Sequence, residues 1–287
     1  MSARPWLLAI YGPTASGKSD LAELIADVTG AGLINADAFQ VYRGMDIGTG
    51  KSSRAAEYAL IDHLNPDETY GVGQFVADAR AALAEDQSAI VVGGTGLYLR
   101  ALTEGYDAMA APPDPELRAL LNRTPLSDLV ESLQREAPAV AAQIDLRNPA
   151  RVRRALERAR QPRAATFITI PHRIVKVALV PDVESTGLRI ERRVNAMLQN
   201  GWIEEIERLA HAGYGPGDPG FRAIGYEVMS AYRDGQVTRD EAVLATVVQT
   251  RQYAKRQRTW LRSEPNLHTL DLARELVSQV MPLISRE

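Results

Sequence analysis

Eight residues near the N-terminus have the types and spacing that bind phosphate. They read Gly12-Pro13-Thr14-Ala15-Ser16-Gly17-Lys18-Ser19 and fit the pattern G-x-x-x-x-G-K-[ST]. Backbone N–H groups of such a loop point at an anion, and the start of the following helix adds partial positive charge. We expect Lys18 to reach a terminal phosphate and the Ser19 hydroxyl to hold Mg²⁺. The alternative is a chance glycine turn.

Two more polar residues follow apolar segments that are typical of buried strands. Asp37 follows residues 32–36, and Thr95 follows residues 89–92 and two glycines. Ligands of a parallel sheet gather at the carboxyl ends of its strands, so both residues are candidates for the same site. Asp37 could contact Mg²⁺ or a substrate amine, or it could be an ordinary capping or loop aspartate. A nucleotide hydrolase usually has an acid at the end of a later strand, and residues 89–92 lack one.

Basic residues gather in two segments whose spacing predicts helices. Spacings of three, four and seven put several of them on shared faces, which suits a phosphodiester backbone. The alternative is a solvated face balanced by acids. The residues are Arg151, Arg153, Arg154, Arg158 and Arg160 in the first segment, and Arg251, Lys255, Arg256, Arg258 and Arg262, with Tyr253 and Trp260 among them, in the second.

The amino-acid composition excludes several classes of protein and of site. Of the 287 residues 45% are apolar, and the net charge is −3, so any nucleic-acid contact must come from local patches. The chain has no cysteine, which excludes disulfides, cysteine–zinc sites and thiol catalysis, and fits a reducing cytoplasm. No signal peptide or membrane-spanning segment is visible. We expect a cytoplasmic protein without membrane contact.

The order of the predicted elements indicates an α/β fold. Strands at residues 6–10, 32–36 and 89–92 alternate with helices, as in a P-loop NTPase-like parallel sheet with helices on both faces. A proline-rich stretch from residue 111 to 115 separates this part from four short helical pieces. We predict a core in two parts, 1–111 and 172–287, around a small all-helical insertion domain at 112–171. In the second part we expect strands at 174–180 and 267–271, and helices at 187–212 and 239–262.

Several of these segments together resemble the tRNA dimethylallyltransferases, which prenylate the adenosine next to the anticodon. The matching segments spread over most of the chain in the order of that family. Ala38 departs from the pattern, because the family usually has serine there. The segments are residues 12–19, 35–49 (NADAFQVYRGMDIGT), 93–98 (GGTGLY), 151–157, 223–226 (AIGY) and 250–260.

The resemblance implies roles for individual residues. The loop 12–19 would hold the diphosphate of dimethylallyl diphosphate, with Mg²⁺, in place of ATP. Asp37 would accept a proton or hydrogen bond from the adenine amine, and Thr95 and Arg222 would join Lys18 in binding pyrophosphate oxygens. The tRNA anticodon stem-loop would contact Asp37, Ala38, Phe39, Gln40, Thr95, Arg118, Arg151, Arg154, Arg251 and Lys255. A monomer is expected.

Three other functions stay open from the residues alone. A small-molecule phosphotransferase that binds ATP would use the same loop, but the missing strand-end acid argues against it. A prenyltransferase for free adenylate would share the core and would not need the basic helices. A non-catalytic RNA-binding module would not need Lys18, Ser19 and Asp37 together.

Overall fold

The computed structural model describes residues 4–84, 87–105, 114–161 and 170–285. The chain divides into two compact units, which we call the core unit and the helical unit. The core unit comprises Met1–Tyr106 and Thr169–Glu287, and the helical unit comprises Asp107–Ile168. The insertion that we predict at 112–171 overlaps the helical unit over most of its length.

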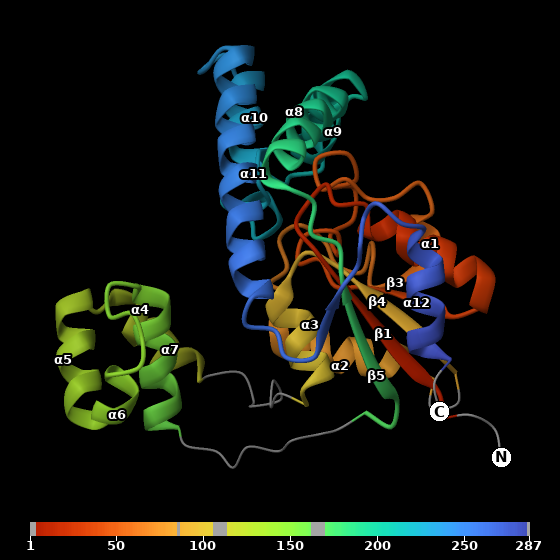
Figure 1. Ribbon diagram of the computed structural model, residues 1–287. Helices are drawn as coiled ribbons and strands as arrows, with labels where there is room; N and C mark the ends of the chain where they lie inside the picture. Colours follow the sequence, from red (N-terminus) through yellow and green to blue (C-terminus); the bar gives the residue numbers. More distant parts are fainter. Residues whose placement is uncertain (1–3, 85–86, 106–113, 162–169, 286–287) are drawn as a thin grey trace. The chain divides into compact units, whose positions relative to one another are not determined.

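A six-stranded parallel sheet forms the centre of the core unit (Figure 1). Its order is β3-β2-β4-β1-β5-β6, and every neighbouring pair is parallel. The carboxyl ends of β2, β4 and β1 therefore lie next to one another, as the sequence analysis expects. The strands are β1 (Trp6–Tyr11), β2 (Gly32–Asn35), β3 (Tyr58–Ala59), β4 (Ala89–Val92), β5 (Arg173–Ala178) and β6 (Leu267–Thr269).

Helices cover both faces of this sheet. Successive side chains of a strand point to opposite faces, and Leu8 and Ile10 of β1 share one buried cluster with Ile25 and Ile284. The other face of β1 packs against α3. The strands consequently read as continuous apolar runs, which is typical of a sheet buried on both sides. The helices next to the sheet are α1 (Lys18–Thr29), α12 (Leu276–Ile284), α2 (Val72–Ala82) and α3 (Gly96–Thr103).

Four further helices of the core unit share a second apolar cluster with the loops that follow β2. The single helix that we predict at 187–212 is wrong, because Gly201, with φ 95°, ends one helix and caps the next. The break lets Trp202 pack fully buried against Tyr226, with ring centroids 5.7 Å apart. The helices are α8 (Val183–Gln199), α9 (Trp202–His211), α10 (Tyr226–Arg233) and α11 (Arg239–Leu261).

The helical unit has its own apolar core. Leu129 and Leu133 of one helix pack with Val152 and Leu156 of another, and all four are buried. Asp114 and Asn148 cap the first and last helices through their side chains. All four predicted helical pieces are present: α4 (Pro115–Arg123), α5 (Leu126–Glu136), α6 (Pro138–Ala141) and α7 (Pro149–Arg160). In the part of the chain that the structure describes, no helix has the length and apolarity to cross a membrane.

Gly93, just after β4, allows the ends of β2 and β4 to approach closely. A Cβ on Gly93 would lie 2.3 Å from the carbonyl oxygen of Ala36 and 2.8 Å from the Asp37 nitrogen. A side chain there would therefore push these strand ends apart.

We expect Gly93→Ala to lower the free energy of unfolding by about 1–3 kcal/mol, because it overpacks a backbone contact that cannot move aside. Gly32→Ala at the start of β2 is the matched control, since a Cβ there meets no atom within 4 Å. Urea unfolding followed by circular dichroism measures both variants. Equal losses in the two would contradict the close-approach argument.

Candidate active site

Two glycines shape the loop between β1 and α1. A Cβ on Gly12 would lie 2.5 Å from the carbonyl oxygen of Leu179, so the loop can pass there only without a side chain. Gly17 has φ 86° and precedes the first turn of α1 in the left-handed conformation that glycine favours. Ser16 Oγ is buried in the loop without a hydrogen-bond partner. The loop thus presents a concave surface with an unsatisfied hydroxyl, as a phosphate site would.

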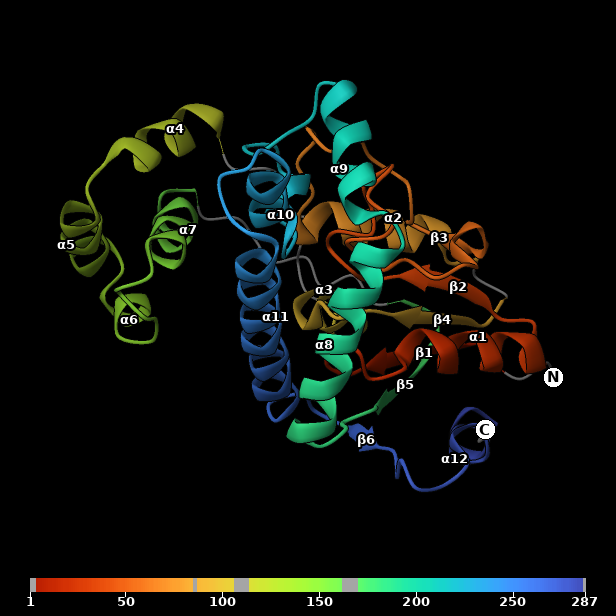
Figure 2. The same ribbon diagram turned by 90° about the horizontal axis from the view of Figure 1, so that it is seen from above.

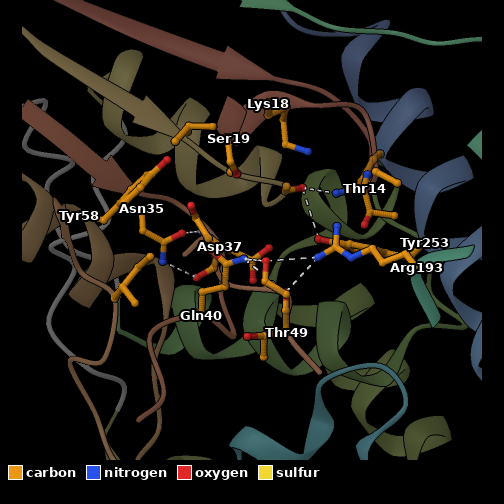
Figure 3. Close-up of a pocket in the computed structure, with 18 residues that line it drawn as sticks. Thr14, Lys18, Ser19, Asn35, Asp37, Gln40, Thr49, Tyr58, Arg193 and Tyr253 are labelled. Atoms are coloured by element: carbon orange, nitrogen blue, oxygen red, sulfur yellow. Dashed lines mark hydrogen bonds between the residues drawn. The ribbon is translucent and has the colours of Figure 1, made fainter. Parts of the chain in front are cut away.

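A cavity that we call the first cavity lies beside this loop (Figure 3). It brings together Lys18, Ser19, Asp37 and Gln40, four of the residues predicted from the sequence. Arg193 of α8 and Tyr253 of α11 reach it from helices distant in the sequence. The full lining is Thr14, Ala15, Lys18, Ser19, Asn35, Asp37, Gln40, Thr49, Gly50, Ser52, Tyr58, Ile61, Val92, Gly93, Gly94, Arg193, Tyr253 and Gln257.

Lys18 carries the positive charge of the loop. Its Nζ donates a hydrogen bond to the carbonyl of Pro13 at 2.7 Å. Burial of the ammonium lowers the pKa of Lys18 to about 8, with a further lowering by Arg193 and an opposing effect of Asp37. A bound polyanion would reverse this shift, because it favours the charged form.

Asp37 lies at the end of β2, and its two carboxylate oxygens have different surroundings. Oδ1 accepts a hydrogen bond from the Phe39 N–H at 2.9 Å, so the loop-aspartate reading is correct for this oxygen. Oδ2 lies 3.5 Å from the position of a Cβ on Gly94, a residue that lines the first cavity. Asn35 holds the backbone of Asp37 through its side-chain oxygen at 3.0 Å. One carboxylate oxygen is thus held by the backbone, while no hydrogen bond to the other is found among the described residues.

Asp37 also lines a second cavity, of about 270 Å³. It shares Thr14, Asp37, Thr49, Arg193 and Tyr253 with the first cavity, so the two meet at these residues. Its own walls are largely apolar and include Phe39, Ile190, Val194, Met197, Trp202 and Ile224. This arrangement places one carboxylate between a polar and an apolar compartment.

Thr95 and Arg222 lie apart from the first cavity. Arg222 is exposed and lines the second cavity. Thr95 lines a third cavity of about 160 Å³, beside Gly12 and Trp260. The Thr95 hydroxyl accepts a hydrogen bond from the Ala38 N–H at 3.2 Å, which holds the segment after Asp37. The pyrophosphate contacts of both residues stay predictions.

Gln257 of α11 links the ends of two strands, a role that no local sequence pattern predicts. Its Oε1 accepts from the Thr14 N–H at 2.8 Å, and its Nε2 donates to the carbonyl of Gly94 at 2.8 Å. Tyr253, one turn earlier, donates to the same carbonyl at 3.3 Å. Because the glutamine side chain is buried, α11 fixes the spacing between the phosphate loop and the end of β4.

Glu205 of α9 organises the loop at residues 46–50, and it too is missed from the sequence. Its buried carboxylate accepts the N–H groups of residues 46, 47 and 48 at 2.7, 2.6 and 3.1 Å. The Tyr226 hydroxyl donates to the same carboxylate at 2.6 Å. Gln40 donates to the carbonyls of Thr49 and Gly50 at 3.3 and 3.2 Å. Gln40 therefore supports this loop, and its contact with a target base stays a prediction.

The basic residues of α11 differ in the contacts that their side chains make within the protein. Arg258 donates to the carbonyls of Pro181 and Asp182 and to the Thr186 hydroxyl, at 2.6 to 2.9 Å. Arg251 pairs with Glu191 at 2.5 Å. Lys255 and Arg256 are exposed. The acidic partner of Arg251 thus belongs to α8, and the sequence around α11 does not predict it.

In the helical unit, two of the three arginines predicted to bind tRNA share one carboxylate. Arg118 and Arg154 each lie 3.0 Å from an oxygen of Glu157, which is buried. Burial raises the pKa of Glu157, but the hydrogen bonds from both arginines outweigh it and the pKa is lowered. Arg151 is exposed. Of the basic segment at 151–160, Arg154 therefore fits the alternative in which acids balance the charge, and Arg118 pairs with the same acid.

Two family models and many known sequences match the chain. The IPP transferase model matches residues 40–264, and the isopentenyl transferase model matches residues 5–60. The tRNA dimethylallyltransferase 1 of Citrifermentans bemidjiense is 39% identical over 282 residues, covering 92% of each chain. The tRNA dimethylallyltransferase of Synechococcus sp. strain JA-3-3Ab is also 39% identical, over 97% of this chain and 86% of its own.

Solved structures match as well. The full-length tRNA isopentenylpyrophosphate transferase of Bacillus halodurans has a TM-score of 0.71 and 33% identity, covering 98% of this chain and 95% of its own. A eukaryotic dimethylallyltransferase, described as acting on tRNA, has a TM-score of 0.75 with 22% identity and covers 97% of this chain and 78% of its own. The second match shows likeness of fold alone.

The lowered pKa of Lys18 predicts how anion binding depends on pH. The ammonium is present below its pKa of about 8 and is lost as pH rises through that value. We expect the affinity for inorganic pyrophosphate, measured by calorimetry, to fall as the pH is raised from one unit below the pKa of Lys18 to one unit above it. In Lys18→Met the affinity for pyrophosphate should be weaker at every pH, and the fall that the Lys18 ammonium causes should be absent. A wild-type affinity without that fall would refute the assignment.

Proposed function

The chain belongs to the IPP transferase family, and from this premise we propose that it transfers a dimethylallyl group from dimethylallyl diphosphate to tRNA. The acceptor is the exocyclic amine of the adenosine on the 3′ side of the anticodon. The observation that carries the proposal is the place of Asp37, between a phosphate-binding loop and an apolar cavity.

The first cavity suits the diphosphate of the prenyl donor. The loop supplies backbone N–H groups at the start of α1, and Lys18 adds a full charge within hydrogen-bond reach of the loop. Charge-assisted hydrogen bonds of this kind favour the product pyrophosphate more than the ester, because negative charge grows as the C–O bond breaks.

Mg²⁺ fits the same cavity. Ser19 lines it with a hydroxyl, Asp37 with a carboxylate, and Ser16 Oγ is buried close by without a partner. Oxygen groups of this kind and diphosphate oxygens are the ligands that Mg²⁺ prefers. When bound, the ion would neutralise charge on the leaving diphosphate. Ser19 would hold it, and Asp37 faces the same space.

The second cavity suits the apolar and aromatic parts of the reactants. The adenine amine is a weak nucleophile because its lone pair is delocalised into the ring, so the allylic carbon must be strongly activated. The allylic C–O bond breaks, the amine nitrogen bonds to the carbon, and Asp37 Oδ2 accepts the proton that the nitrogen loses. The base must leave its stack to reach this space.

The exposed basic residues supply contacts for the RNA backbone. Lys255 and Arg256 lie on α11, the helix that also bears Tyr253 of both cavities. Arg222 adds an exposed cation on the second cavity. In the helical unit Arg151 is exposed. Contacts of this kind to phosphates fix the position of an RNA without reading its sequence.

A direct test follows the transferred group. The protein is incubated with dimethylallyl diphosphate, Mg²⁺ and unmodified tRNA, and the nucleosides are analysed by mass. We expect one prenylated adenosine per tRNA beside the anticodon, with none on free AMP and no consumption of ATP. Modification of free AMP alone would favour the adenylate prenyltransferase, and ATP consumption would favour the phosphotransferase.

Asp37→Asn isolates the proton-accepting role. The amide oxygen can still accept from the Phe39 N–H, so the loop keeps its shape, while the carboxylate charge is lost. We expect turnover to fall about a hundredfold or more with tRNA affinity nearly unchanged. Asp67→Asn, at an exposed loop position, is the matched control. Near-normal turnover in Asp37→Asn would rule out Asp37 as the base.

Lys255 and Arg258 give opposite predictions for RNA binding. Lys255 is exposed, so Lys255→Ala should reduce the magnitude of the slope of log affinity against log salt by roughly one, which is the contribution of one phosphate contact. Arg258 is engaged with the protein, so Arg258→Ala should keep the slope and reduce thermal stability. Filter binding of an anticodon stem-loop across a salt series tests both. A reduced slope in Arg258→Ala alone would reverse the assignment.

A further inference from the structure

The second cavity runs along two helices that pack side by side, α8 and α11 (Figure 2). Its lining residues recur at spacings of three and four on each helix, so each helix contributes one face. They include Ile190, Arg193, Val194 and Met197 on α8, and Thr246, Thr250 and Tyr253 on α11. On α8 the lining extends over about 10 Å of helix axis. The cavity therefore has two ends, one toward each end of α8.

The end of the cavity beside the start of α8 is polar. Arg258 of α11 donates to the Thr186 hydroxyl near the start of α8. Arg251, earlier on α11, pairs with Glu191, later on α8, so the two helices run antiparallel. The start of α8 consequently lies beside the later part of α11, whose exposed Arg256 lines the cavity. A hydrocarbon chain would avoid this end.

The opposite end of the cavity is apolar. Val194 and Met197 of α8 lead to it, and Trp202, the first residue of α9, is fully buried in its wall. Thr246 of α11 donates its hydroxyl to the carbonyl of Ala242 at 2.8 Å, so its polar group is already satisfied. A hydrocarbon chain that enters the second cavity is therefore expected at the end that Met197 lines.

The first cavity determines where such a chain begins. Thr14, Asp37 and Arg193 line both cavities. An ester whose diphosphate lies in the first cavity would consequently have its allylic carbon at this junction. Met197 follows Arg193 on α8 by one helical turn, which is about 6 Å along the axis. This distance leaves room for a short chain ahead of Met197.

Behind Met197 lies a groove at the surface, which we call the outer groove. Its volume is about 560 Å³. Its lining includes Ile47, Gly50, Arg193, Ala196, Met197 and Asn200, of which Ala196 and Asn200 are exposed. Of the described residues, Arg193 and Met197 alone line both the outer groove and the second cavity. These two side chains therefore separate the two spaces.

Met197 is the adjustable part of this partition. Arg193 donates to the carbonyls of Thr49 and Gly50, which hold it in place. Met197 is half-buried and packs against the apolar cluster that the four helices share. Its side chain is unbranched and flexible. Shortening it would join the second cavity to the outer groove and would leave no closed void in the core.

We infer that Met197 closes the apolar end of the second cavity and thereby limits the length of the prenyl chain that the protein accepts. That the ligand is a prenyl diphosphate rests on the proposed function. The five carbons of a dimethylallyl group fit ahead of Met197, whereas the second isoprene unit of geranyl diphosphate would collide with its side chain. A hydrophobic pocket discriminates by size in this way, because overpacking a close-packed wall is costly.

The third cavity is the less favoured place for the chain. It is also largely apolar, with Leu99 and Trp260 in its lining. Among the described residues that line it, however, neither Lys18 nor Asp37 is present. A chain in the third cavity would draw the allylic carbon away from Asp37, which accepts the proton in the proposed reaction.

Calorimetry with dimethylallyl diphosphate and with geranyl diphosphate, each with Mg²⁺ and without tRNA, tests the inference by binding alone. We expect the wild type to prefer dimethylallyl diphosphate. Met197→Ala should shift the ratio of the two affinities toward geranyl diphosphate by roughly tenfold to a hundredfold. Met197→Leu keeps the side-chain volume and should keep the wild-type ratio. Asn200→Ala is the matched control, because Asn200 lines the outer groove but not the second cavity.

Three results would overturn the inference. One is a folded Met197→Ala with the wild-type ratio, and another is a wild type that binds both donors equally. The third is a shifted ratio in Leu99→Ala without a shift in Met197→Ala, which would place the chain in the third cavity. If Met197→Ala does not fold, Met197→Val decides by the same ratio.

Transfer assays separate this inference from the proposed function. With tRNA and geranyl diphosphate, Met197→Ala should attach a ten-carbon group to adenosine, detected by nucleoside mass, where the wild type attaches little. If neither donor modifies tRNA in any variant while Met197→Ala gains affinity for geranyl diphosphate, the proposed function is wrong and the inference about chain length stands.

Discussion

The approach of Gly93 to the backbone of Ala36 is the contact on which the site depends. It brings the ends of β2 and β4 so close that no side chain fits between them. Gln257 then joins the end of β4 to the phosphate loop after β1, with one amide hydrogen bond in each direction. Three strand ends, and with them Lys18 and Asp37, are thus fixed by one backbone contact and one buried side chain.

The positive and negative charges of the site do not balance. Lys18 and Arg193 repel each other, and Asp37 opposes the pKa shift of each. One carboxylate cannot neutralise two cations, particularly when one of its oxygens already accepts from the Phe39 N–H. A diphosphate with its metal ion would complete the balance. Under the proposed function, cations that are already in place when the C–O bond breaks would favour the departing pyrophosphate without reorganisation.

Local sequence patterns predict those parts of the fold and the site that neighbouring residues form. The phosphate loop and the strands of the sheet centre follow from neighbouring residues. The break at Gly201 is marked locally by the pair Asn200-Gly201, although the prediction runs one helix through it. The Trp202 side chain that follows the break packs against Tyr226, which is a contact between distant segments. Helix α3 begins at Gly96, with Thr95 at its N-cap position after the pair Gly93-Gly94. A Cβ on Gly96 would lie 2.4 Å from Trp260, which is a contact between distant segments.

The roles of charged residues escape the sequence for the same reason. Arg258 and Lys255 cannot be told apart in the sequence, yet Arg258 donates hydrogen bonds to the two carbonyls that precede α8. Glu205 resembles any acid on an amphipathic helix, yet it binds three consecutive N–H groups of the loop at 46–48. That loop presents the carbonyls on which Arg193 rests. The loop on which Arg193 rests is therefore held largely by contacts between segments far apart in the chain, to which Gln40 adds shorter-range hydrogen bonds to Thr49 and Gly50.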